Sequence, residues 1–247
     1  MTEPLREPAG VEALELLSTG RLEVVGRLTD ASNATFYATV EAGGAEAACV
    51  YKPVAGERPL WDFPDGTLAG REVAAFAVSE ALGWGVVPPT VHRDGPFGEG
   101  MVQLWVDGDP DVELVALSRR TDHAGLRRMA VFDAVINNSD RKIGHLLPVP
   151  GGHLYGCDHG VSFAEEYKLR TVLWQWQGEP LTEEALDGLA RLAGLMAEAG
   201  GPLAEELAVR LTGPERYALR RRVELLLEHR VHPYPSPAWP SVPWPPV

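Results

Sequence analysis

The hydrophobic pattern of the sequence changes at residues 107–111, a turn-rich link. Before this link, short alternating segments typical of strands surround a helical segment, and after it apolar residues recur mainly at helical spacing. In the first part, strands are predicted at 21–27, 36–41, 47–53 and 100–106, and helices at 11–18 and 71–82. Residues 86–91 contain Pro88-Pro89 and lead to an edge strand.

The second part contains the longer helices and one hairpin. Helices are predicted at 123–137, 182–199, 202–211 and 214–230. Two short strands, 146–149 and 153–157, are joined by Pro150-Gly151-Gly152, and Gly-Gly favours a tight turn. Because strands and helices are segregated along the chain, we expect an α+β protein of two lobes, 1–106 and 107–231.

The last sixteen residues, 232–247, form a third segment with seven prolines and two tryptophans. Proline cannot continue a helix or a central strand, so this tail is expected to be extended. It either packs on the body of the protein or binds a protein partner.

Composition narrows the possible partners and locations. The 22 basic and 35 acidic residues give a formal charge of −13, which disfavours nucleic acid and anionic membranes as partners. The sequence shows no apolar run long enough for a transmembrane segment and no secretory signal, so a cytoplasmic protein is expected. The two cysteines, Cys49 and Cys157, are read as reduced buried thiols.

Two features of the first part are suited to phosphate binding. Lys52 ends a predicted strand between apolar neighbours, and Glu72 begins the next helix, where it could hold the lysine ammonium. The strand-to-strand segment before them offers hydroxyl and amide groups at Ser32 and Asn33. An ordinary strand-end lysine and an ordinary hairpin turn fit the same residues.

A polar cluster follows the predicted helix 123–137. Asp140 could accept the proton of a substrate hydroxyl, and Arg141 could pair with a carboxylate or a phosphate. Asp158 ends a strand before His159-Gly160 and could bind Mg²⁺, with His145 as a second metal ligand. The alternatives are a helix cap with a surface turn, and a half-buried histidine.

The sequence resembles the phosphatidylinositol 3-/4-kinase-like branch of the protein-kinase-like fold, including HipA-type and type II phosphatidylinositol 4-kinase-like enzymes, and most of all small actinobacterial proteins of this kind. The resemblance rests on three segments and spans roughly residues 20–230. The segments are Val-Tyr-Lys-Pro at 50–53, Phe-Asp-Ala-Val-Ile-Asn-Asn-Ser-Asp-Arg at 132–141 and Tyr-Gly-Cys-Asp-His-Gly at 155–160.

The resemblance implies an ATP-dependent kinase and a role for each matching residue. Lys52, braced by Glu72, would hold the α- and β-phosphates; Asp140 would be the catalytic carboxylate. Asp158 would bind Mg²⁺ or Mn²⁺, and Asp133 would brace the catalytic loop. The hinge that meets the adenine would consist of Gln103, Leu104, Trp105 and Val106.

Three departures from the pattern shape the expected function. His145 stands where many relatives have Asn, the phosphate-covering loop lacks glycines, and the segment after Gly160 has no basic run for an inositol phosphate. A protein acceptor or autophosphorylation is therefore expected rather than a lipid. The alternatives are a pseudokinase or nucleotide-binding scaffold, an interaction protein that acts through its tail, and a small-molecule kinase.

Overall fold

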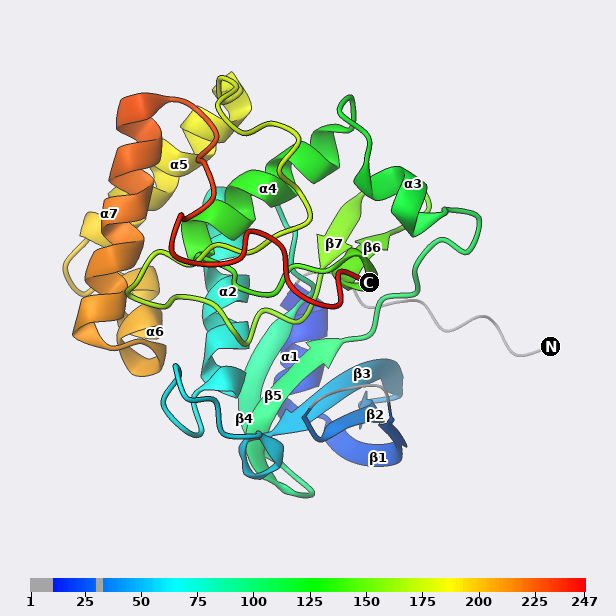
Figure 1. Ribbon diagram of the computed structural model, residues 1–247. Coiled ribbons are helices and arrows are strands. Elements are labelled where there is room, and N and C mark those ends of the chain that lie inside the picture. Colours follow the sequence, from blue (N-terminus) through cyan, green and yellow to red (C-terminus); the bar gives the residue numbers. More distant parts are fainter. Residues whose placement is uncertain (1–10, 30–32) are drawn as a thin grey trace. The chain divides into compact units, whose positions relative to one another are not determined.

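The computed structural model describes residues 11–29 and 33–247 (Figure 1). The chain forms two compact units, each with its own hydrophobic core. The first comprises Met1–Val73 and Pro88–Val106, and the second comprises Ala74–Val87 and Asp107–Val247. The predicted α+β class is confirmed: the first unit is built on an antiparallel sheet, and the second is mainly helical with one hairpin.

The first unit contains a five-stranded antiparallel sheet with the order β1-β2-β3-β5-β4. The strands are β1 (Arg21–Leu28), β2 (Thr35–Ala42), β3 (Ala45–Pro53), β4 (Thr90–Gly95) and β5 (Gly98–Leu104). β2 and β3 are joined at Gly43-Gly44, both with positive φ, the conformation that a tight hairpin turn requires. β4 lies at the sheet edge, as the prolines before it predict.

One face of this sheet is covered by α1 (Val11–Thr19). Leu16 and Leu17 of the helix pack with Val40, Cys49 and Tyr51 of the strands, and all five side chains are buried. The core fixes the register of β3, whose alternate residues point into it. Lys52, next to Tyr51, therefore projects from the opposite face.

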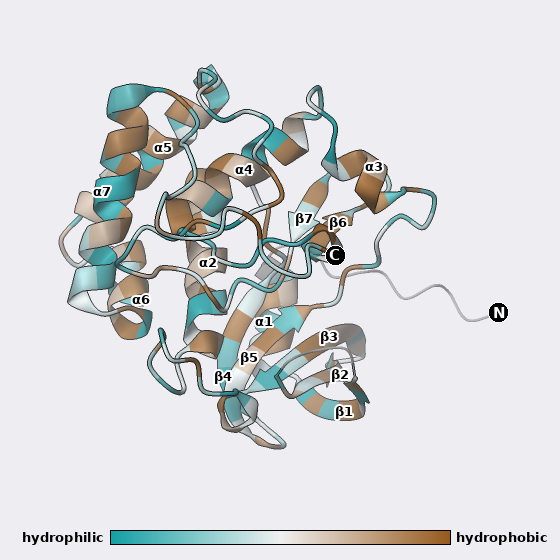
Figure 2. Cartoon of the chain, in the orientation of Figure 1, coloured by the Kyte–Doolittle hydropathy of each residue, from teal (hydrophilic) through white to brown (hydrophobic). Residues whose placement is uncertain are grey.

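Helix α2 (Leu68–Leu82) contributes to both cores through different turns. Ala69 and Val73 pack with Met101 in the first unit. Residues 74–82 pack in the core of the second unit, together with α4 (Ala124–Ile136). α4 is buried almost all round from Met129 to Ile136, and Figure 2 shows it as largely hydrophobic.

The second unit contains four further helices among the described residues. They are α3 (Leu114–Ser118), α5 (Glu183–Ala197), α6 (Pro202–Arg210) and α7 (Gly213–His229). α7 packs against α4 and α5, and in Figure 2 it alternates hydrophobic and hydrophilic turns. The predicted hairpin is confirmed as β6 (Leu146–Pro148) and β7 (Leu154–Gly156). α3 is not predicted from the sequence; its N-cap is Glu113, whose carboxylate accepts the N–H groups of Val115 and Ala116.

The C-terminal segment 232–247 contains neither helix nor strand. It is not continuously extended, however, because Ser236 Oγ accepts the N–H of Ala238 and closes a turn. Across the described residues, no helix is both long enough and apolar enough to cross a membrane.

His232, at the start of this segment, links the tail to the second unit. Its N–H donates to Glu179 O at 2.9 Å, and its Nε2 accepts from Arg127 Nε at 3.3 Å. Burial, with the positive charge of Arg127, lowers the pKa of His232 to about 4, so the imidazole is neutral in the folded protein.

This depressed pKa predicts a pH-dependent stability. The unfolded chain takes up a proton at His232 near pH 6.5, whereas the folded protein does so only near pH 4. The free energy of unfolding therefore falls between these values, by up to about 3 kcal/mol. His232→Gln removes this contribution, so urea unfolding at pH 7 and pH 4.5 should show a smaller difference for the variant.

His229→Gln, at an exposed position of α7, is the matched control and retains the wild-type difference. Equal differences for wild type and His232→Gln would show that His232 does not titrate in this way.

Candidate active site

A buried ion pair joins β3 to α2 in the first unit. Lys52 Nζ lies 2.7 Å from Glu72 Oε1, and the side chains are 18% and 2% exposed. Glu57 accepts the N–H groups of Leu68 and Ala69, which caps the helix that carries Glu72. The pairing expected from the sequence is therefore present, and the lysine side chain stays partly exposed.

The segment between β1 and β2 is only partly described. Ser32 lies outside the described residues. Asn33 Oδ1 accepts the N–H of Arg58 at 2.9 Å, and the N–H of Ala34 donates to Gly56 O at 3.0 Å. The amide of Asn33 therefore fastens the turn to the segment after β3.

The segment Gln103–Val106 leaves the end of β5. The Gln103 side chain is buried and donates to Thr90 Oγ1 at 2.8 Å. The N–H groups of Leu104 and Trp105 donate to Pro89 O and Ala48 O. These three donors serve the sheet itself, so a nucleotide contact at this segment would have to use other groups.

In the second unit, α4 ends in two asparagines that hold the following chain. Asn137 has φ +54°, in the left-handed region that Asn tolerates. Its Nδ2 donates to the carbonyls of Ala164 and Glu166, and its Oδ1 accepts the N–H of Lys168. Asn138 Oδ1 accepts the N–H of Asp140 at 2.9 Å, which fixes the backbone at that carboxylate.

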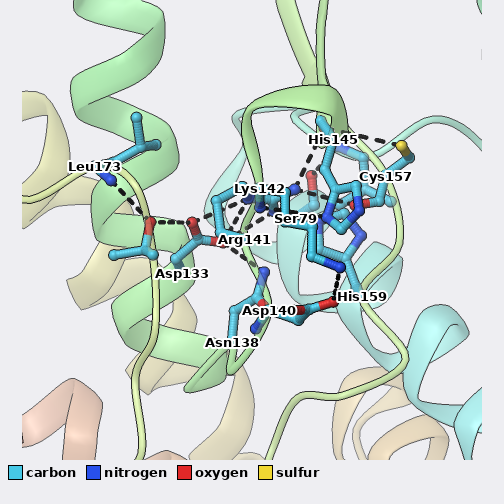
Figure 3. A network of polar contacts seen from close by, with 12 residues as sticks. Ser79, Asp133, Asn138, Asp140, Arg141, Lys142, His145, Cys157, His159 and Leu173 are labelled. Carbon is cyan, nitrogen blue, oxygen red and sulfur yellow. Dashed lines mark hydrogen bonds and ion pairs between the residues drawn. The ribbon is translucent and has the colours of Figure 1, made fainter. Parts of the chain in front are cut away.

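Asp133 and Arg141 form a fully buried ion pair beneath this loop (Figure 3). Arg141 Nη2 lies 2.9 Å from Asp133 Oδ1, and Nε lies 3.0 Å from Oδ2. Asp133 also accepts from Asn138 Nδ2 at 2.9 Å and from Thr171 Oγ1 at 3.3 Å. The expected bracing of the loop by Asp133 is seen in this geometry.

Arg141 reaches the hairpin side of the site as well. Its Nη1 donates to Cys157 O at 3.0 Å, and its Nη2 lies 2.7 Å from His159 Nε2. Burial alone would lower the pKa of Arg141, but the charge and hydrogen bonds of Asp133 outweigh it and raise the pKa. The sequence allowed either a carboxylate or a phosphate as the partner of Arg141, and in the structure the partner is the Asp133 carboxylate. Because the guanidinium is buried, it is not placed to touch a substrate.

Asp140, next to Arg141 in the loop, keeps 28% of its side chain exposed. Lys142 Nζ lies 3.1 Å from Asp140 Oδ2. Burial raises the pKa of Asp140 and the charge of Asp158 adds to this, whereas Lys142 and Arg170 act in the opposite direction; the pKa is raised overall. Asp140 is thus an accessible carboxylate with increased proton affinity, as a general base requires.

Asp158 follows β7 with φ +60° and a side chain that is half exposed. His145 Nε2 lies 3.4 Å from Asp158 Oδ2, and His145 Nδ1 accepts the N–H of Lys142 at 3.4 Å. If Nδ1 accepts, the ring proton resides on Nε2 and faces Asp158. Within the described residues, no group of three or more His, Cys, Asp or Glu side chains is arranged to hold a metal ion.

Two residues of this site do not emerge from sequence reasoning. The sequence contains a signal for Lys142, because this residue follows Asp140 by two positions in Asp-Arg-Lys. Arg170 had no such signal. The backbone brings it to the loop: its N–H donates to Asn138 O at 2.9 Å, and its carbonyl accepts the N–H of Arg141 at 3.1 Å.

The buried pair predicts a large loss of stability when one partner is removed. Asp133→Ala leaves Arg141 charged, buried and without its carboxylate, which costs about 3–5 kcal/mol. Chemical denaturation of wild type and variant measures this loss directly. Asp122→Ala, which removes an exposed partner of Arg120 at 2.9 Å, is the control and should leave the unfolding midpoint unchanged. Equal midpoints for Asp133→Ala and the control would contradict the central role of the pair.

Comparison with known proteins places the chain among its relatives. No protein-family model matches it. Among solved structures, it is similar to the Helicobacter pylori proinflammatory kinase CtkA, with a TM-score of 0.45 and 11% identity, over 87% of this chain and 94% of that chain. We draw no assignment from a likeness this distant. Protein Rv2133c of Mycobacterium tuberculosis is 48% identical, over 93% of this chain and 94% of that protein. The chain therefore belongs to the family of protein Rv2133c.

Proposed function

We propose that the protein is an ATP-dependent phosphotransferase of the protein-kinase-like class that uses Mg²⁺ or Mn²⁺. The observation that carries this proposal is the arrangement of Asp140, Lys142 and Asp158 in the second unit. The accessible carboxylates of Asp140 and Asp158 interact electrostatically, and the Lys142 ammonium forms an ion pair with Asp140. The Lys52–Glu72 ion pair of the first unit supports the same class, because a partly exposed ammonium braced by a carboxylate is suited to phosphate oxygens.

In the proposed reaction, Asp140 accepts the proton of the acceptor hydroxyl. As the proton leaves, the hydroxyl oxygen forms its bond to the γ-phosphorus, and the bond from that phosphorus to the β,γ-bridging oxygen breaks. The products are the phosphorylated acceptor and ADP, and Asp140 then releases its proton to solvent. Lys142 keeps the Asp140 carboxylate oriented and offers positive charge beside the transferred group.

The residues present fit a divalent cation bound together with phosphates. Mg²⁺ is commonly held by one or two carboxylates, with phosphate oxygens and water completing its octahedron. Asp158 would supply such a carboxylate, because Asp140 is the proton acceptor in the proposed reaction. The bound ion would neutralise charge on the phosphates during transfer. Because His145 directs Nε2 at Asp158, we assign it to orienting that carboxylate rather than to binding the metal directly.

The proposal is tested by intact-mass spectrometry after incubation with ATP and Mg²⁺ or Mn²⁺, alone and with a cell extract supplying protein acceptors. We expect phosphate transfer by the wild type, and a rate lowered about 10²–10⁴-fold in Asp140→Asn, because general-base catalysis is removed. Asp187→Asn, on the exposed side of α5, is the control and should retain the wild-type rate.

Two outcomes would overturn the assignment in different ways. Equal transfer by wild type and Asp140→Asn would remove Asp140 from the reaction. A thermal shift with ATP but no transfer to any acceptor would instead identify the nucleotide-binding, non-catalytic alternative.

A second prediction concerns the first unit. Lys52→Met removes the ammonium that faces Glu72, so the dissociation constant for ATP should rise at least about tenfold, which corresponds to 1.4 kcal/mol. Isothermal titration calorimetry measures this change. Glu72→Gln keeps the shape of the partner but removes its charge, and should weaken binding less. Unchanged ATP affinity in Lys52→Met would separate this ion pair from nucleotide binding.

A further inference from the structure

The C-terminal segment lies along the second unit and is held mainly through its backbone carbonyls (red in Figure 1). Ser241 O accepts two hydrogen bonds, from the N–H of Thr171 at 3.0 Å and from Trp174 Nε1 at 2.8 Å. Pro246 O accepts the N–H of Ile143 at 2.9 Å. The protein therefore presents a row of donors to this segment.

One side chain of the segment adds a second kind of contact. Trp239 Nε1 donates to Glu166 Oε1 at 3.0 Å, and Lys168 Nζ lies 4.8 Å from the centre of the Trp239 ring. Trp244, by contrast, is 86% exposed. Trp239 thus anchors the segment, whereas Trp244 contributes little to its attachment.

The surface under this segment belongs to the same network as Asp140. Ile143 follows Asp140 by three residues, in the candidate catalytic loop. Thr171, which donates its N–H to Ser241 O, also bonds Asp133 through Oγ1, and it pairs with Arg141 in an isolated β-bridge. A chain bound here is therefore held by the two segments that fix the position of Asp140.

These donors bind backbone carbonyls, which every residue has, so they can bind any polypeptide of similar conformation. Proline lacks an N–H but keeps a carbonyl acceptor. The seven prolines of residues 232–247 therefore cost the segment none of these contacts. The donors fit a proline-rich, non-helical polypeptide, and nothing in the contacts calls for the phosphates of a lipid or a nucleic acid.

We propose that this surface, formed by Ile143 and residues 166–174, is the acceptor site for a proline-rich segment of a protein substrate. Residues 234–247 occupy it as an internal competitor. The inference rests on the proposed phosphotransferase function, for which it names the acceptor class and a means of control: a substrate binds when the tail is displaced.

The test uses full-length Trp239→Ala, with Trp244→Ala as the matched control. Hydrogen exchange should become at least about tenfold faster at the N–H groups of Thr171 and Ile143 in Trp239→Ala only. Exchange at Arg141 and Arg170, whose N–H groups bond between these two segments and not to the tail, should stay unchanged and so exclude general unfolding. Excess synthetic peptide 232–247 should restore the slow exchange.

Transfer is measured separately, with a proline-rich serine peptide as acceptor. We expect Trp239→Ala to phosphorylate it several-fold faster than Trp244→Ala does. Equal exchange in the two variants, or no restoration by the peptide, overturns the displaceable segment. Faster exchange with equal, non-zero transfer overturns the acceptor role. The expected exchange and peptide binding, with no transfer by any form of the protein, would instead reject the proposed phosphotransferase function and leave a peptide-binding surface.

Discussion

The buried ion pair between Asp133 and Arg141 holds together the segments that form the candidate site of the second unit. Asp133 belongs to α4, which is buried from Met129 to Ile136, and Arg141 extends from the loop after it to the carbonyl of Cys157 beside Asp158. Thr171 joins the same carboxylate from the segment under the tail. Two charges removed from water are stable only when their hydrogen bonds are satisfied, so the pair specifies where each of these segments must lie.

Solvent exposure separates the residues that support the site from those that can react. Asp133 and Arg141 are fully buried and saturated by protein partners. Asp140 and Asp158 are 28% and 50% exposed, and they carry their carboxylates at fixed backbone positions. The buried part of the site is therefore one ion pair that no ligand can reach. This leaves the accessible carboxylates to meet a substrate, as preorganisation requires.

Much of this arrangement could be predicted from the sequence, because it depends on local signals. Alternating and helical hydrophobic patterns give the strands and long helices, and the polar run after a buried helix marks Asp140. The burial of Arg141 could not be predicted in this way, since either a carboxylate or a phosphate could have been its partner. The charge of Arg170 acts on Asp140 because its backbone bonds to Asn138 and Arg141, contacts that link residues about thirty positions apart.

The conformation of the tail could likewise be predicted only in part from its sequence. Its prolines exclude a helix or a central strand, but they do not say what satisfies its carbonyls. The structure supplies those partners from Thr171, Trp174 and Ile143, residues that also surround the candidate catalytic loop. Apart from the Trp239 side chain, which anchors it, the tail is bound through groups common to every polypeptide. A surface that holds one such segment can hold another, so the proposed competition between tail and substrate rests on these backbone hydrogen bonds together with the Trp239 anchor.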